Sequence, residues 1–239
     1  MAKYPFVRAR NYTRVGGRDI DLIVVHTAEY PERPTGAEWV ADYFAGRNAP
    51  RASAHYAIDN DSVVQGVRDQ DVAWAAPGAN HNGLQFEHAG YAAQGTADWH
   101  DPYSQAMLRR SAMLAAEKVV QYNIPLRWLG VNGLEAGGRG FVTHDTVSKT
   151  FRLSDHWDPG KSFPHGEYLR LVKDYRLALV AEPEPKPHWK WRWARWRLGE
   201  GEYREFGPMK GPRPGDAPAR IPPQVWAWYA LFVSRRRKK

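Results

Sequence analysis

Three residues of this chain are of the types that could hold a divalent metal ion. His26 follows the apolar run Leu-Ile-Val-Val, His144 follows Phe-Val-Thr, and Asp158 precedes Pro-Gly. A hydrolytic zinc site needs three protein ligands drawn from His, Asp, Glu or Cys and an open position for water. Because the chain has no cysteine, these two histidines and this aspartate are the residues that could form such a site, although their spacing alone indicates it only weakly. The alternative for each histidine is a hydrogen-bonded structural role at the end of a strand.

Short β-branched or alternating runs predict the strands that would carry the two histidines. These strands are expected at residues 21–26, 54–58, 62–65, 84–87 and 140–144. Helices are expected to start after Thr35 and after Asp101, and a third is expected at residues 166–180. Strands and helices intermix without regular alternation, so we expect an α/β fold with a central mixed β-sheet flanked by helices.

The composition of the chain is that of a globular protein and argues against disulfide-rich and membrane-spanning proteins. With 239 residues, of which 43% are hydrophobic, the chain is long enough for one substantial core. The absence of cysteine excludes a disulfide scaffold and a thiolate nucleophile. The longest apolar run, residues 225–233, is well short of the roughly 18 residues that cross a bilayer, so we expect no transmembrane segment. The N-terminal residues contain no apolar stretch that would predict a secretory signal.

The charge of the chain is divided between two parts. Residues 1–185 carry 20 Lys and Arg against 22 Asp and Glu, whereas residues 186–239 carry 14 against 4. Proline alternates with charged residues at the boundary, which predicts an extended linker. We therefore expect one domain at residues 1–180, a Pro-rich linker at 181–187 and a basic, Trp-rich module at 188–239.

Five motifs, in order along the first of these domains, make the chain similar to a known family. They lie at residues 23–29, 53–59, 72–74 with 82–87, 141–144 and 156–160. On these motifs the chain resembles the type-2 N-acetylmuramoyl-L-alanine amidases, which are the zinc amidases of peptidoglycan recognition proteins and bacteriophage endolysins. The resemblance is strongest to endolysins of actinobacterial phages. It covers residues 15–180 and implies a type-2 amidase-like catalytic domain, followed by a small β-rich C-terminal module.

The resemblance implies a role for each residue of the predicted site. The family's two zinc histidines fall on His26 and His144, and its third ligand falls on Asp158, with one Zn²⁺ per chain. Glu87 falls on the glutamate that many members use as general base, and a carboxylate suits the task of taking a proton from an acidified water. The alternative for Glu87 is a salt-bridged carboxylate at a strand end. His156 stands where many relatives have a lysine that stabilises an oxyanion, and a histidine could do the same.

Three further residues are predicted to contact substrate. Tyr56 lies on the strand expected at residues 54–58 and could line the cleft. Trp74 could stack on a sugar or peptide, although core packing is equally compatible with its position. His81 lies in a loop rich in glycine and asparagine that could rim the groove.

The module expected at residues 188–239 alternates Trp with Lys or Arg between Trp189 and Trp196. A strand there would have one indole face and one cationic face. We interpret it as a wall-binding module whose indoles stack on sugars and whose cations meet an anionic wall polymer. The alternative is that the indoles form the module's own core. Binding of nucleic acid is not expected, because it would leave the five motifs unexplained.

Together these inferences predict a zinc-dependent peptidoglycan amidase of the endolysin type. It would hydrolyse the amide bond between N-acetylmuramic acid and the L-alanine of the stem peptide. The alternative is a peptidoglycan-binding protein on the same fold that does not hydrolyse its ligand. We expect a monomer that stays in the host cytoplasm before its release to the cell wall.

Overall fold

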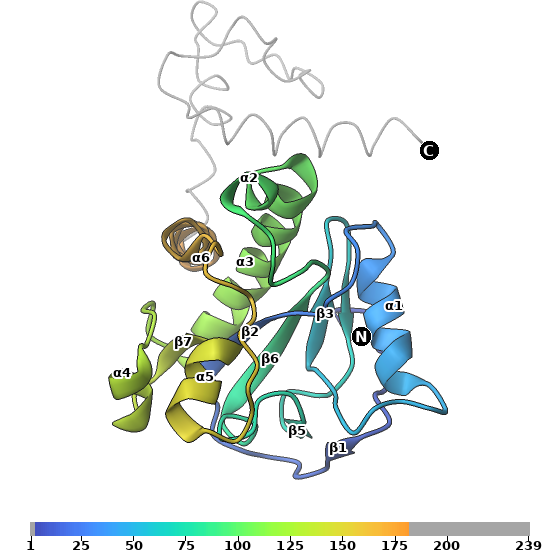
Figure 1. Cartoon of the computed structure of the whole chain (residues 1–239). Coiled ribbons are helices and arrows are strands. Elements are labelled where there is room, and N and C mark those ends of the chain that lie inside the picture. The colour runs from blue at the N-terminus through green and yellow to red at the C-terminus, as the bar shows by residue number, and fades with distance from the viewer. Residues whose placement is uncertain (1–2, 182–239) are drawn as a thin grey trace, which may run out of the picture. The chain divides into compact units, whose positions relative to one another are not determined.

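The apolar runs of the chain assemble into a five-stranded sheet in a computed structural model that describes residues 3–181 (Figure 1). The order of its strands is β4-β3-β6-β2-β7, and only β4 runs antiparallel to its neighbour. The strands are β2 (Leu22–Thr27), β3 (Tyr56–Ile58), β4 (Val63–Gln65), β6 (Gly83–His88) and β7 (Gly140–Thr143). All residues of the neighbouring strands β2 and β6 are buried. Parallel strands covered on both faces are expected to be rich in apolar residues, and Leu22 to Val25 follow that rule.

Helices cover both faces of the sheet. The helices are α1 (Gly36–Ala45), α2 (Thr96–Trp99), α3 (Pro102–Tyr122), α4 (Val131–Glu135), α5 (His144–Phe151) and α6 (His165–Val180). Helices α3 and α6 share the largest apolar cluster with one face of the sheet. On the other face, α1 packs against β3 and β4, whereas α4 and α5 pack against β2 and β7. A separate pair of short antiparallel strands joins β1 (Tyr12–Thr13) to β5 (Val72–Ala73). The predicted fold class, α/β with a central mixed sheet flanked by helices, is confirmed.

Alternation along the strands decides which side chains share a face. Ile23 and Val25 of β2 and Phe86 of β6 belong to the cluster with α3. His26 and Glu87 are paired in register across the two parallel strands. Because neighbouring residues of a strand point to opposite faces, both side chains lie on the side that carries α1 and α5.

One expectation about the end of an element is wrong in detail. His144 was expected to end a strand, but Thr143 ends β7 and caps α5 by accepting a hydrogen bond from the Thr146 N–H (3.1 Å). The helix expected to start after Thr35 does so, since α1 begins at Gly36, but the Thr35 side chain makes no capping hydrogen bond. The Ala37 N–H of that first turn instead donates to the Asp59 carboxylate (2.9 Å), so the cap comes from the far end of β3.

The predictions for the C-terminal part of the chain are not addressed by this structure. Apart from Ala181, the linker expected at residues 181–187 and the module expected at 188–239 lie outside the described residues. Among residues 3–181, no helix is both long and apolar enough to span a membrane.

Candidate metal centre

The two histidines and the aspartate predicted to bind a metal meet in one buried cluster. One ligand atom from each of His26, His144 and Asp158 lies within 4.8 Å of the other two. The Nδ1 atoms of the two rings are 3.1 Å apart. Asp158 reaches both rings, with Oδ2 3.2 Å from His26 Nδ1 and Oδ1 3.1 Å from His144 Nδ1. Residues from β2, from the start of α5 and from the loop before α6 are thereby brought together.

The ring of His26 is oriented by a glutamine behind it. Its Nε2 lies 2.8 Å from Gln85 Oε1, and an amide oxygen can only accept a hydrogen bond. In the neutral form of the ring, which is the form that binds a metal, the His26 proton therefore sits on Nε2, and the lone pair of Nδ1 faces the space between Asp158 and His144. Ligating histidines commonly have such a partner on their other nitrogen.

Gln85 is itself held in place from two sides. Its side-chain NH₂ donates to the Ala79 carbonyl (3.1 Å), and its backbone N–H donates to Nδ1 of the buried His55 (3.0 Å). Burial, with a contribution from Arg18, lowers the pKa of His55 to about 3, so the ring stays neutral and Nδ1 remains an acceptor. His55 is thus a buried residue that is hydrogen-bonded within the sheet.

The loop that carries Asp158 is fixed against two neighbouring segments. The Asp145 N–H at the start of α5 donates to the Asp158 carbonyl (3.0 Å). Gly160 has φ +85°, and a Cβ there would lie 1.9 Å from the Ala92 carbonyl oxygen. Only glycine permits this close approach, so the Asp-Pro-Gly sequence aims the carboxylate at the two histidines.

Glu87 is buried beside the cluster, and one of its carboxylate oxygens makes no hydrogen bond within residues 3–181. Only 8% of the residue is exposed, and Oε2 has no hydrogen-bond partner among the described residues. Burial raises the pKa of Glu87 to about 7, although His26 opposes the shift; Asp158 and Glu29 add to it. A carboxylate that can hold or release a proton near neutral pH is suited to general-base chemistry.

The electrostatics of the cluster favour a cation at its centre. Burial would raise the pKa of Asp158, but the neighbouring His144 and His26 hold it well below its ordinary value. Burial would lower the pKa of His26, yet Glu87 and Asp158 raise it to about 9. The carboxylates thus stabilise positive charge between them. Asp158 Oδ2 is buried and makes no hydrogen bond of good geometry within the described part of the chain, although it lies 3.2 Å from His26 Nδ1; such an oxygen suits a metal ion.

His156 lies at the solvent side of this cluster. Its ring stacks on His144 with centroids 4.4 Å apart and planes 10° apart. Its Nδ1 is 3.7 Å from Asp158 Oδ1, while 61% of the side chain is exposed. The structure therefore brings His156 next to the predicted ligands, in a position from which it can reach a bound molecule.

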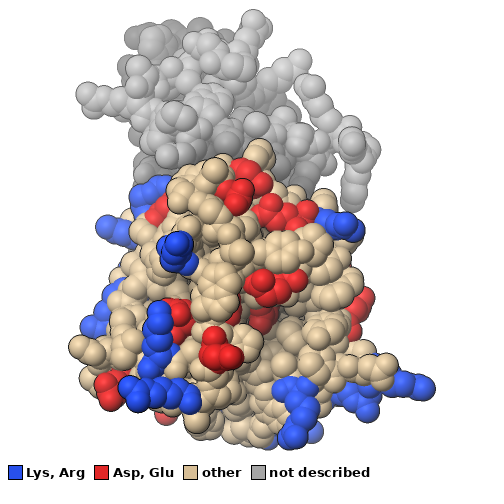
Figure 2. All heavy atoms as spheres, viewed as in Figure 1, with Lys and Arg blue, Asp and Glu red and all other residues tan. Residues whose placement is uncertain are grey.

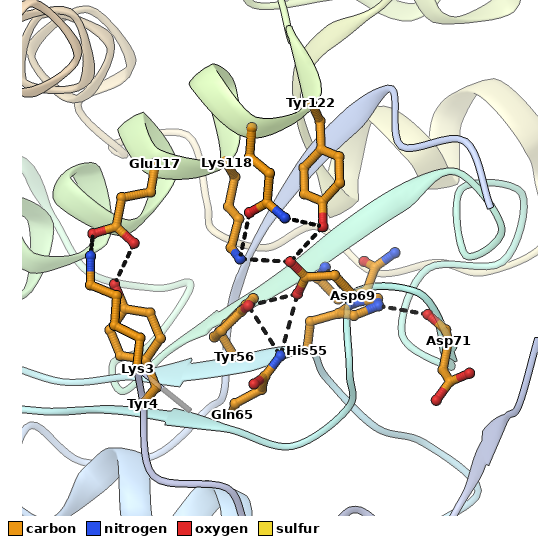
Figure 3. Close-up of polar contacts among 12 residues, drawn as sticks. Lys3, Tyr4, His55, Tyr56, Gln65, Asp69, Asp71, Glu117, Lys118 and Tyr122 are labelled. Atoms are coloured by element: carbon orange, nitrogen blue, oxygen red, sulfur yellow. Dashed lines mark hydrogen bonds and ion pairs between the residues drawn. The ribbon is translucent and has the colours of Figure 1, made fainter. Parts of the chain in front are cut away.

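Tyr56 does not lie where a substrate contact was expected, so that prediction is wrong. It pairs in register with Phe86 rather than Glu87, so its side chain points to the opposite face of the sheet from His26. The residue is 1% exposed, and its hydroxyl donates to Asp69 Oδ1 (2.6 Å). Figure 3 shows it in a buried network in which Lys118 also donates to Asp69 (2.6 Å).

The other two predicted substrate contacts make no hydrogen bond or ion pair with the cluster among residues 3–181. The indole N–H of Trp74, which is partly exposed, donates to Thr13 Oγ1 (2.9 Å). His81 is exposed, and its carbonyl accepts a hydrogen bond from Arg18 (2.6 Å). Their predicted contact with substrate stays a prediction.

Gln85 was missed by the sequence analysis. The available signal is its position two residues before Glu87, which places both side chains on one face of β6. Recognising its role also requires knowing that β6 lies beside β2.

Comparisons with known proteins agree with this arrangement. A family model described as N-acetylmuramoyl-L-alanine amidase matches residues 16–161. N-acetylmuramoyl-L-alanine amidase A of Achromobacter lyticus is 31% identical over 134 residues, covering 51% of this chain and 69% of that protein. The hydrolase AmiA of Staphylococcus aureus, solved in complex with its ligand, superposes with a TM-score of 0.57 at 20% identity, covering 77% of this chain and 88% of AmiA. An AmpD structure superposes with a TM-score of 0.50 at 20% identity, covering 72% of this chain and 96% of AmpD. At these identities the two structures show the fold alone.

Proposed function

The chain belongs to the N-acetylmuramoyl-L-alanine amidase family, and from this premise we propose that it is a zinc-dependent enzyme with Glu87 as its general base. It is an amidase that acts on peptidoglycan. The bond that we assign to it joins the lactyl group of N-acetylmuramic acid to the L-alanine of the stem peptide. The arrangement that carries the proposal is the convergence of His26, His144 and Asp158 beside the buried Glu87, whose Oε2 has no hydrogen-bond partner among residues 3–181.

The donor set suits zinc better than the hard divalent cations. Imidazole nitrogen is a common zinc ligand, whereas magnesium and calcium prefer all-oxygen sites. Two imidazoles and one carboxylate are three protein ligands, as in hydrolytic zinc sites that leave a position open. When bound, the ion would supply Lewis-acid activation of a water molecule and of the scissile carbonyl.

Glu87 would move the proton that the reaction requires. Its free Oε2 accepts a proton from the attacking water and later delivers it to the nitrogen of the departing L-alanine. Burial raises the pKa of Glu87, which makes this carboxylate a better proton acceptor than an exposed one and suits it to both steps. Burial keeps other water away from this carboxylate, and Gln85 keeps the His26 ring from rotating.

His156 would stabilise the negative charge that develops on the carbonyl oxygen. Its exposed ring is held over His144 by stacking, which positions an N–H donor at the open side of the cluster. A donor aimed at the developing oxyanion lowers the barrier more than it strengthens substrate binding.

The biological role that we propose is that of a bacteriophage endolysin, acting on the host wall after release from the host cytoplasm. The motifs shared with endolysins support this role. In this proposal residues 188–239, whose basic residues greatly outnumber acidic ones, attach the enzyme to an anionic wall polymer.

A direct test compares cleavage of a soluble muropeptide by the zinc-loaded protein, the chelated protein and the His26→Ala variant. We expect cleavage at the lactyl amide by the first alone, with restoration when zinc is returned to the chelated wild type. Mass spectrometry of the products identifies the bond. Undiminished cleavage by His26→Ala, or by protein shown to be free of metal, would overturn the mechanism.

A further inference from the structure

A pocket of about 350 Å³ away from the metal centre is surrounded by three arginines, Arg8, Arg14 and Arg68. We propose that this arginine pocket binds a phosphate group of an anionic glycopolymer of the bacterial wall. The proposal rests on the proposed action on peptidoglycan, because that action brings the protein to the wall. None of the residues of the metal cluster lines the pocket, so the two sites are separate.

The first arginine lies on a backbone segment that is tied to the sheet. The N–H groups on either side of Arg8, those of Val7 and Ala9, donate to the carbonyls of Gln65 (3.0 Å) and Gly66 (2.9 Å). The segment therefore continues the sheet beyond β4. Arg8 is exposed, but the backbone that carries it has a fixed position.

The other two arginines approach the pocket from different segments. Arg68 follows β4, and its guanidinium lies 5.1 Å from the centre of the Phe6 ring, a cation–π arrangement that restrains it. Arg14 follows β1, and the next residue, Val15, donates its N–H to the Asp71 carboxylate (2.9 Å). Three separately anchored segments thus each contribute an arginine to the lining of one pocket.

The positive charge of the pocket is not neutralised by the protein. Within residues 3–181, none of the three arginines has a carboxylate oxygen within 4.0 Å, whereas Arg139 and Arg170 are paired with Asp21 and Asp174. The single acidic residue in the lining is Asp71, which is 6% exposed and accepts hydrogen bonds from backbone N–H groups. On the face shown in Figure 2, basic side chains without acidic neighbours gather at the lower right, near β1.

Phosphate is the anion that fits this chemistry. The planar guanidinium donates two parallel hydrogen bonds to phosphate oxygens, and three such groups can satisfy several oxygens at once. The cavity is large enough for a phosphate together with part of the polyol or sugar on either side. A phosphodiester polymer attached to peptidoglycan would bring such groups to the enzyme at high local concentration.

The test uses the full chain and two matched double variants. Arg8→Ala/Arg68→Ala removes two lining arginines, and Arg109→Ala/Arg176→Ala removes two exposed arginines of α3 and α6 with the same change in net charge. Inorganic phosphate should raise the melting temperature of the wild type and of the control variant. We expect phosphate binding to be about tenfold weaker in the pocket variant, since hydrogen bonds to charged groups contribute at least that factor. Equal stabilisation of both variants by phosphate would overturn the proposal.

A second arm identifies the source of the phosphate. Co-sedimentation with purified walls should be weaker for the pocket variant than for the control, and this difference should vanish once the walls are stripped of their phosphate polymer. Two results would refute the assignment to a wall polymer. One is a difference in co-sedimentation between the two variants that persists on stripped walls. The other is stronger competition for the wild type by duplex DNA than by the released polymer at equal phosphate concentration.

Folding and the proposed activity are checked separately. If the pocket variant melts before binding can be measured, Arg8→Lys/Arg68→Lys keeps the charge and loses the bidentate geometry, and it should bind phosphate more weakly than the wild type. All variants should cleave a soluble muropeptide, which lacks the polymer, at the wild-type rate. A wild type that fails to cleave it refutes the amidase mechanism, whereas equal phosphate and wall binding by all variants refutes the pocket alone.

Discussion

Replacing Gln85 by methionine should weaken zinc binding without removing a ligand. Methionine is close to glutamine in size but has no amide, so the His26 Nε2–H loses its acceptor at 2.8 Å. Leaving a buried donor without a partner costs about 1–3 kcal/mol. Loss of such an outer partner typically lowers metal affinity about 10- to 100-fold, which corresponds to about 1.4–2.7 kcal/mol. We therefore expect Gln85→Met to lower the affinity for zinc by about 10- to 100-fold.

The assay is competition for Zn²⁺ against a chromophoric chelator, with cleavage of muropeptide measured at saturating zinc. Activity at saturation should stay within about tenfold of wild type, because the ligands and Glu87 remain and any residual effect is one lost hydrogen bond. Gln105→Met on α3 is the control, since Gln105 also donates to a backbone carbonyl, that of Trp99 (3.1 Å), but does not contact the cluster.

The control variant should bind zinc as the wild type does. A Gln85→Met protein with wild-type zinc affinity would show that Gln85 does not orient His26. A loss of zinc affinity of equal size in both glutamine variants would show that the effect is one of general stability.

Three further predictions concern single side chains. Glu87→Gln should lower kcat about 10²- to 10⁴-fold while zinc binding is retained; a competition assay showing lost zinc would instead make Glu87 a ligand. His156→Ala should lower kcat about 10- to 100-fold with little change in KM, and His156→Lys should restore most of it; an unchanged kcat in the alanine variant contradicts its role. His55, with its pKa lowered to about 3, stabilises the fold fully above pH 6.5 and less as the pH falls toward 3, because the unfolded chain then binds the extra proton. Urea unfolding between pH 6 and 4 should show stability falling about 1.4 kcal/mol per pH unit more steeply in the wild type than in His55→Gln, and equal slopes would disprove this.

The sequence predicts the buried face of a helix correctly only where the apolar residues of that helix pack against the sheet. On α3, Met107, Leu108 and Leu114 are buried as their spacing indicates. On α1, Trp39 and Tyr43 also follow helical spacing, yet they are 45% and 48% exposed and stack on each other with parallel ring planes. Aromatic residues can be stabilised by one another at the surface as well as by the core, and the sequence alone does not distinguish the two cases.

What the sequence determined by itself is the chemistry of the centre. The absence of cysteine leaves histidine and carboxylates as the strong ligands, and the apolar run before His26 requires a buried strand. The Pro-Gly after Asp158 requires a tight turn. These features depend only on residue types and their spacing along a short stretch of the chain, so they can be read without knowing the tertiary structure.

Only the tertiary structure decided which side chains meet. Tyr56 and Glu87 lie on adjacent strands, and their registers send one toward Asp69 on the face of α3 and the other toward His26. Gln85 acts on His26 only because β6 pairs with β2, across 59 residues of sequence. Side chains alternate between the two faces of a strand. A shift of one residue in strand register would therefore send Glu87 toward the buried network around Asp69 and Tyr56 toward the metal centre. The pairing of distant strands sets that register.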